Sequence, residues 1–86
     1  MISKNIFEIE DIFSIEGIGI IVAGTLKNGN ILKGMKTIIN GKTAEVASIE
    51  QYHKKIDMID AVGSSAGLLL KGVEKKDISL GEIFLQ

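Results

Sequence analysis

The sequence predicts an all-β domain, either a barrel or a sandwich. Short apolar runs, rich in Ile, Val and Leu, are separated by turn residues at intervals of about 8–12 residues, which is typical of both architectures. No stretch keeps a helical period of apolar residues for as many as about 11 positions. β-branched residues supply much of the 45% apolar content, and they favour strands over helices.

The first element is predicted to be a hairpin. Apolar residues at positions 7, 9, 13 and 15 alternate with other residues, as expected of a strand, and the break at Asp11 indicates an irregular centre. Glycines at positions 17 and 19 predict a tight reversal of the chain. The second strand should run from Ile20 to Leu26. Gly24 within it predicts a bulge or a close approach of another backbone.

The middle of the chain contains two Asn-Gly pairs, which favour two-residue turns of the primed type. Asn28-Gly29 is predicted to form the first such turn, and Asn40-Gly41 the second. Residues 33–36 should form another reversal, followed by a short strand at residues 37–39. A long strand is then expected over residues 42–51.

The last third of the chain is less regular. Residues 52–61 carry many charges and are predicted to form a loop. Residues 66–71 are a short, strongly apolar run that predicts a strand. Residues 74–77 are predicted to form one exposed helical turn, and residues 83–85 should form a strand that closes the structure.

Length and charge set limits on function. The chain makes a single domain over residues 1–86, and a domain of this size buries only about 60–65% of its unfolded surface, which leaves little room for a deep active site. The net charge is −1 and all ten basic residues are Lys, so neither DNA nor a membrane surface is predicted as a partner. The chain has no Cys, no signal peptide and no apolar run of membrane-spanning length, which predicts a soluble cytoplasmic protein.

Catalysis and metal binding are not predicted. A single histidine, His53, and the absence of Cys and of a Gly-x-Ser-x-Gly motif leave no pair of nucleophile and base. Glu8 and Glu10 should lie on one face of their strand and Asp11 on the other, so no paired carboxylates are expected. No His or carboxylate spacing matches a metal-binding loop. We therefore expect a non-enzymatic protein with no cofactor.

Three glycine-containing segments come close to phosphate-binding motifs without matching them. Residues 17–19 lack the third glycine of the dinucleotide motif and open a strand, not a helix. Residues 29–37 carry an extra Met35 that moves the lysine out of register, and no helix start follows that could bind phosphate. Residues 41–43 lack the leading glycine. All three segments are predicted to be turns, so no nucleotide site of these types is expected.

Three blocks of sequence carry a resemblance to a known family. They are residues 11–26, whose two β-rich runs flank Gly-Ile-Gly, residues 49–57 (Ile-Glu-Gln-Tyr-His-Lys-Lys-Ile-Asp) and residues 62–73 (Val-Gly-Ser-Ser-Ala-Gly-Leu-Leu-Leu-Lys-Gly-Val). Together they resemble the β-barrel that follows the GTPase domain in elongation factor Tu and in the selenocysteine-specific elongation factor. The resemblance extends from Phe7 to Phe84, and it implies a closed six-stranded Greek-key barrel without the GTPase machinery. The initiating Met and a full barrel favour an independent protein over a fragment.

In elongation factor Tu, this barrel helps to hold the aminoacylated 3′ end of tRNA, which implies a module that engages tRNA or ribosomal RNA. The RNA-binding residues implied by the resemblance are Glu50, Tyr52, His53, Lys54, Ser65 and Leu69. Among them, Glu50 and Leu69 match the glutamate and the apolar residue beside the terminal adenosine. Matches to the residues that line the aminoacyl pocket are Glu10, Asp11 and Phe13. The alternative is that these residues are retained for the architecture of the barrel.

Departures from the family lead to a second hypothesis. Ile18 replaces an arginine and Ile20 a threonine, so a polar rim becomes apolar. Because the strands here are apolar on both faces, some of this wall should contact another protein. The predicted interface comprises Ile18, Ile20 and Val22, and the partner would be a separate translational GTPase or a second copy in a homodimer. A third hypothesis is a small-molecule binder that uses the aminoacyl-like pocket near Asp11 and Phe13.

Overall fold

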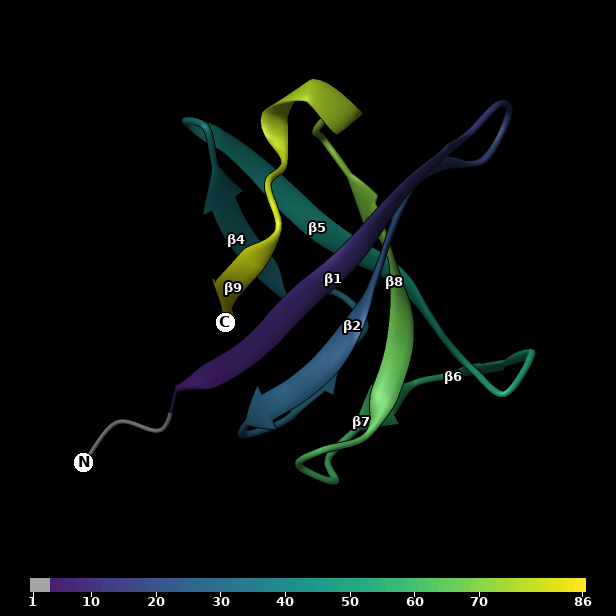
Figure 1. The fold of residues 1–86 in the computed structure, drawn as a ribbon, viewed down its shortest axis with the longest axis vertical. Coiled ribbons are helices and arrows are strands. Elements are labelled where there is room, and N and C mark those ends of the chain that lie inside the picture. Colours follow the sequence, from purple (N-terminus) through teal and green to yellow (C-terminus); the bar gives the residue numbers. More distant parts are fainter. Residues whose placement is uncertain (1–3) are drawn as a thin grey trace.

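The computed structural model of the protein describes residues 4–86, which form nine strands and one short 3₁₀ helix (Figure 1). In chain order these are β1 (Asn5–Ile15), β2 (Gly19–Asn28), β3 (Ile31–Leu32), β4 (Lys36–Ile39), β5 (Lys42–Gln51), β6 (Lys54–Ile56), β7 (Met58–Ile59), β8 (Ser65–Lys71), η1 (Lys75–Asp77) and β9 (Gly81–Leu85). The prediction of an all-β domain is confirmed. Within these residues, no helix has the length and apolar character needed to cross a membrane.

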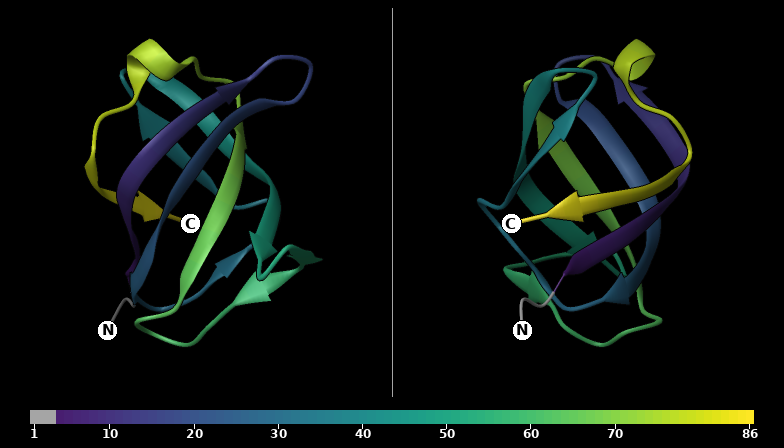
Figure 2. Two further views of the ribbon diagram at one scale, coloured as in Figure 1. Left: turned by 45° about the vertical axis from the view of Figure 1, so that its right-hand side comes forward. Right: turned by 90° about the vertical axis from the view of Figure 1, so that its left-hand side faces the viewer.

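Six of the strands form a nearly closed antiparallel barrel in the order β4-β5-β8-β2-β1-β9. β4, β5 and β8 are neighbours in the order in which they follow one another along the chain. β8 then lies beside the earlier strand β2, which is a Greek-key arrangement. The barrel closes where the end of β9 meets the start of β4, as the right-hand view of Figure 2 shows. There, Lys36 and Gln86 exchange two backbone hydrogen bonds of 2.8 and 2.9 Å.

The core is built from alternate residues of these strands. Along β2, the even-numbered residues face the interior and the odd-numbered residues are partly exposed. Ile20 is therefore only 7% exposed and Val22 is fully buried, packed in one cluster with Phe7 and Leu68. The predicted protein interface is thus wrong for Ile20 and Val22, because both side chains belong to the core. The outward residue between them is Ile21.

Three of the predicted turns are confirmed, and one of them is the reversal at residues 33–36, where the Met35 amide donates a 3.1 Å hydrogen bond to the Leu32 carbonyl. Residues 16–18 form the β1–β2 turn, with a 3.0 Å hydrogen bond from the Ile18 amide to the Ile15 carbonyl. Asn40 and Gly41 both have positive φ angles, 51° and 76°, as a type I′ turn between β4 and β5 requires. The predicted helical turn is also present, as η1.

The prediction for Asn28-Gly29 is wrong. β2 ends at Asn28, but β3 pairs with β7 and not with β2, so no hairpin forms. Instead, the Asn28 side chain donates a 2.7 Å hydrogen bond to the Lys4 carbonyl, and the Asn5 side chain accepts one of 3.1 Å from the Asn30 amide. These contacts hold the segment against the start of β1. The predicted loop at residues 52–61 is likewise wrong, because it contains β6 and β7.

A bulge at Glu10 changes the exposure of the first strand. Ile9 pairs with Gly24 and Asp11 pairs with Ala23, so Glu10 is an extra residue in β1. As a result Glu10 and Asp11 are both exposed, which corrects the expectation that they lie on opposite faces. At the same place a Cβ atom on Gly24 would overlap the carbonyl oxygen of Glu8, which confirms the predicted close approach of two backbones.

Asp77 attaches η1 to the β4–β5 turn. Its side chain is only 2% exposed and accepts hydrogen bonds of 2.9 Å from the Glu74 amide, the Asn40 side chain and the Lys42 ammonium. The Glu74 amide, followed by Asn40 and Lys42, holds the pKa of Asp77 well below its ordinary value. The hydrogen bond from Lys42 to Asp77 in turn raises the pKa of Lys42.

This network predicts a loss of stability in acid. Because the folded state lowers the pKa of Asp77, its contribution is fully present above the unfolded pKa of about 4 and is lost as the pH falls through the lower folded value. We expect urea midpoints to fall below about pH 4, and to fall less steeply in an Asp77→Asn variant. An identical acid dependence in the two proteins would contradict this assignment.

Candidate functional site

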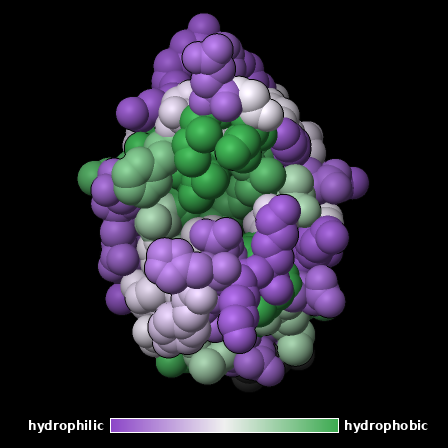
Figure 3. Space-filling model, turned by 90° about the vertical axis from the view of Figure 1, so that its right-hand side faces the viewer, coloured by the Kyte–Doolittle hydropathy of each residue, from purple (hydrophilic) through white to green (hydrophobic). Residues whose placement is uncertain are grey.

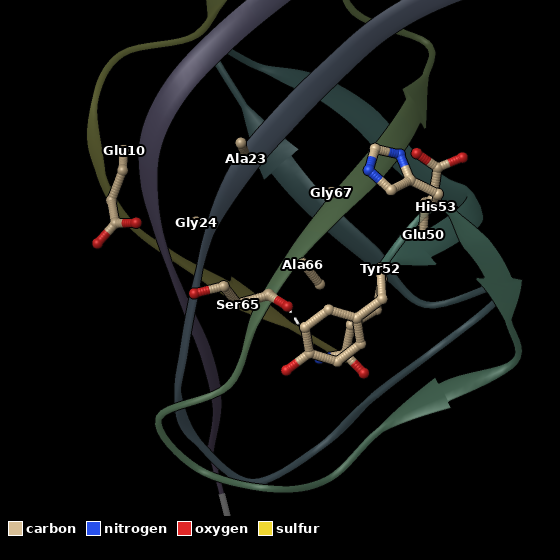
Figure 4. Close-up of a pocket in the computed structure, with 10 residues that line it drawn as sticks. Glu10, Ala23, Gly24, Glu50, Tyr52, His53, Ser65, Ala66 and Gly67 are labelled. Atoms are coloured by element: carbon tan, nitrogen blue, oxygen red, sulfur yellow. Dashed lines mark hydrogen bonds between the residues drawn. The ribbon is translucent and has the colours of Figure 1, made fainter.

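A groove of about 370 Å³, lined by both polar and small residues, lies on the outside of the barrel (Figure 4). Small residues of β2 and β8 form part of its lining, so the surface is hollowed where larger side chains would fill it. Glu10 lies on one side of the groove, and Tyr52 and His53 lie on the other (Figure 4). The lining residues are Glu10, Ala23, Gly24, Glu50, Gln51, Tyr52, His53, Ser65, Ala66 and Gly67.

Tyr52 and His53 occupy an unusual backbone conformation. They form the two-residue turn between β5 and β6, bracketed by the Gln51–Lys54 pair, with φ angles of 53° and 63°. The same kind of turn at residues 40–41 has the preferred Asn-Gly sequence. A non-glycine residue in this conformation costs about 1–3 kcal/mol. This turn holds the Tyr52 ring 84% exposed beside the groove.

Hydrogen bonds fix both sides of the groove. The Gln51 side chain donates a 2.9 Å hydrogen bond to the Ser65 carbonyl, which ties the end of β5 to the start of β8. On the opposite side, the Thr25 hydroxyl donates to the Glu10 carboxylate at 3.2–3.3 Å. The groove is therefore a preformed feature of the described structure, with carboxylate acceptors and an exposed aromatic ring along it.

A second, more apolar hollow of about 260 Å³ adjoins the groove. We call it the slot, and its lining residues are Ile18, Ile21, Ser48, Glu50, Lys55, Gly67 and Leu69. Ile21 pairs with Leu69 on one side and with Phe13 on the other, so these three side chains share the outer face of the sheet. Figure 3 shows hydrophobic residues gathered in a hollow on this side of the molecule, surrounded by hydrophilic ones.

Glu50 and Gly67 line both hollows, so the slot and the groove lie side by side. Glu50 is exposed and lies across from Lys55 on β6. Within residues 4–86, Glu50 takes part in no ion pair. Its carboxylate is therefore available as a hydrogen-bond acceptor at the junction of an apolar surface and a polar one.

The structure brings together most of the residues that the sequence analysis singled out. Five of them line the groove: Glu10, Glu50, Tyr52, His53 and Ser65. Ile18 and Leu69 line the slot, together with Glu50. Lys54, Asp11 and Phe13 line neither hollow, whereas Lys55, the neighbour of Lys54, lines the slot. Their roles in binding stay predictions.

Several lining residues escaped the sequence analysis. Two pairs of small residues lie on neighbouring strands and line the groove, namely Ala23-Gly24 on β2 and Ala66-Gly67 on β8. Such pairs are the one signal in the sequence that could have indicated a hollow there. Across the described residues, no group of three His, Asp or Glu side chains is placed to share a metal ion.

Comparison with known proteins shows that this chain is similar to one part of a translation factor. The chain is 38% identical over 77 residues to elongation factor 1-alpha of Sulfolobus acidocaldarius, and 39% identical to the proteins of that name from Saccharolobus solfataricus and Desulfurococcus mucosus. The chain is a translation-factor-like β-barrel. Each match covers 87% of this chain but only 17–18% of the relative, so the chain spans less than a fifth of the length of these proteins. No protein-family model matches the chain.

These matches agree with the fold of the translation-factor-like barrel. A nearly closed six-stranded barrel is the architecture implied by the resemblance to the second domain of translational GTPases, and the strand order confirms it.

Proposed function

We propose that the translation-factor-like barrel is a non-enzymatic module that binds the 3′ end of an RNA. The terminal nucleoside would enter the slot, and the groups attached to it would lie along the groove. The observation that carries this proposal is that the two hollows are neighbours and share the lining residues Glu50 and Gly67. The end of an RNA chain presents a flat base, which an apolar site can hold, and a ribose with polar groups, which hydrogen-bonding residues can hold.

The slot has the chemistry to hold a base. Ile21 and Leu69 offer apolar side chains on which a base can pack, and Ile18 covers the same hollow from the hairpin. Glu50 can accept a hydrogen bond from a ribose hydroxyl or from an exocyclic amine. Along the groove, Tyr52 is exposed and available to stack on a second base, which is worth about 1–3 kcal/mol.

The charges of the site favour an RNA end over an RNA backbone. Glu10 and Glu50 are carboxylates, whereas Lys55 is the one lysine among the residues that line the two hollows. Phosphates would therefore lie at the edge of the site, near Lys54 and Lys55, and not among the carboxylates. With about one or two phosphate contacts, binding should depend on salt only weakly, with a logarithmic slope of about −1. Such a module would act in the cytoplasm.

Titration of the ¹⁵N-labelled protein with adenosine tests the slot directly. We expect saturable shifts of the Ile21, Glu50, Gly67 and Leu69 amides. A Leu69→Gln variant should bind about fivefold to tenfold more weakly, because it loses part of the apolar surface. Ile38→Gln, at an exposed position on β4 outside both hollows, is the matched control and should bind normally. Adenosine that shifts none of the slot amides would refute the proposal.

A second candidate function is protein docking on the apolar wall. Phe13 is 46% exposed and pairs with the slot residue Ile21, and Ile18, which itself lines the slot, is 49% exposed. A separate translational GTPase or a second copy of the chain would fit this wall. Apolar docking should respond little to salt. Because Ile18 belongs to both the wall and the slot, adenosine bound in the slot should compete with such a partner. The small-molecule hypothesis gains no support, because Asp11 and Phe13 line neither hollow.

A further inference from the structure

The slot depends on a projecting part of the molecule. The β1–β2 hairpin extends past the end of the barrel, as Figure 1 shows at the upper right. Ile18 lies in the turn of this hairpin, whereas Ile21, Ser48, Glu50, Lys55, Gly67 and Leu69 all lie on strands. One side of the slot is therefore carried by a turn that the barrel ladders do not hold.

Lys71, at the end of β8, bonds to this turn. Its ammonium group donates a 2.7 Å hydrogen bond to the carbonyl of Ile18, which is 53 residues away in the sequence. Glu45 is the cross-strand partner of Lys71 on β5, yet these two side chains form no ion pair in the described part of the chain. The ammonium is directed to the hairpin carbonyl instead.

Gly19 makes room for this contact. A Cβ atom on Gly19 would lie 3.3 Å from the Lys71 ammonium and 3.3 Å from Cδ1 of Leu69. The Lys71 side chain thus crosses the bare face of Gly19, next to a slot residue. Gly19 has a φ angle of 133°, which side-chain-bearing residues rarely adopt, so the geometry of the turn and the space for Lys71 both depend on glycine.

We propose that Lys71 is a positioning residue that fixes Ile18 over the slot and so sets the fit of the slot to its ligand. Lys71 is not among the residues that line the slot, and it acts through the Ile18 carbonyl. Among the hydrogen bonds of residues 4–86, the one that would remain at Ile18 is that from its amide to the Ile15 carbonyl. The slot would then lose one fixed side. This inference rests on the proposed binding of a nucleoside in the slot.

Two variants of Lys71 test the inference. Lys71→Met keeps the apolar stem and removes the donor, and Lys71→Arg keeps a charged donor. We expect Lys71→Met to lower the ¹H–¹⁵N heteronuclear NOE of Gly17, Ile18 and Gly19 and to weaken adenosine binding about threefold to tenfold. Lys71→Arg should stay within about twofold of the wild type. Adenosine carries no phosphate. A weaker affinity of the Lys71→Met variant for adenosine therefore cannot reflect a missing contact between Lys71 and a phosphate.

The outcomes separate the inference from the proposed function. If Lys71→Met leaves both the NOE values and the adenosine affinity unchanged, the positioning role is refuted. If the turn loosens in Lys71→Met and adenosine binds more weakly than to the wild type, the inference is supported, whereas a loosened turn with unchanged affinity would refute the effect on the fit of the slot. If the wild type binds no adenosine, the proposed function fails, and the NOE values alone decide whether Lys71 holds the hairpin. The side chain of Lys71 is exposed, so both variants should fold, which circular dichroism would verify.

Discussion

Replacement of Gly24 by alanine is expected to lower the free energy of unfolding by about 3 kcal/mol or more. A Cβ atom at this position would overlap the Glu8 carbonyl oxygen and would lie 2.9 Å from the Phe7 ring. The Glu8 oxygen belongs to the backbone of β1, so β1 and β2 must separate at the bulge to relieve the overlap. Overpacking of a core usually costs about 1–3 kcal/mol, and here the obstacle is backbone and not a flexible side chain.

Gly67→Ala provides a matched control for this prediction. Gly67 lies on the neighbouring strand β8 without a positive φ angle, and its Cβ would meet only Cγ2 of Ile21 at 3.4 Å. The control should therefore change stability by less than about 1 kcal/mol. Thermal unfolding is a suitable measurement, because about 3 kcal/mol corresponds to a decrease in Tm of roughly 12–24 °C for a domain of this size. Equal effects of the two substitutions would contradict the close packing of β1 on Gly24.

The second prediction concerns the Tyr52-His53 turn, where stability and binding should change in opposite directions. The double variant Tyr52→Asn, His53→Gly restores the sequence that type I′ turns prefer, so we expect unfolding to require about 2 kcal/mol more. The same variant removes the aromatic ring beside the groove. Its affinity for a short RNA ending in CCA should fall about tenfold, in line with the loss of one stacked base.

The other turn of the same type supplies the reciprocal control. Asn40→Tyr, Gly41→His places the strained pair between β4 and β5, away from the groove. It should destabilise the barrel by a similar amount, to which the loss of the hydrogen bond from Asn40 to Asp77 adds. Its affinity for RNA should stay unchanged. Urea unfolding measures the stability of all three proteins. A double variant at Tyr52 and His53 that is less stable than the wild type would show that these two residues serve the fold.

Local signals explain why most of the fold could be predicted from the sequence. Asn40-Gly41 and the glycines around Ile18 specify their turns by backbone conformation alone, and the observed strand β5 matches the predicted residues 42–51. The failures involve contacts between distant segments. Asn28-Gly29 is held by Lys4 and Asn5, and β7 consists of two residues that pair with β3, so neither could be recognised from a local pattern.

The site was harder to predict than the fold. The run Ile20-Ile21-Val22 is apolar throughout, so its alternation could not show that Ile21 alone of the three faces outward. The bulge at Glu10 shifts the facing of β1, so Asp11 and Phe13 are exposed although Phe7 and Ile9 earlier in the strand are buried. The strained conformation of Tyr52 has no signature in the sequence, because tyrosine is not a residue that this turn favours.

Titration with two RNA hairpins would test the account most directly, one ending in CCA and the other lacking only the terminal adenosine. Amide shifts of the ¹⁵N-labelled protein would be followed at low and moderate salt. We predict saturable shifts at Glu50, Gly67 and Leu69 with the intact end, at least about tenfold weaker binding of the shortened hairpin, and a weak dependence on salt. Equal binding of the two hairpins, or shifts confined to other faces of the barrel, would contradict the account.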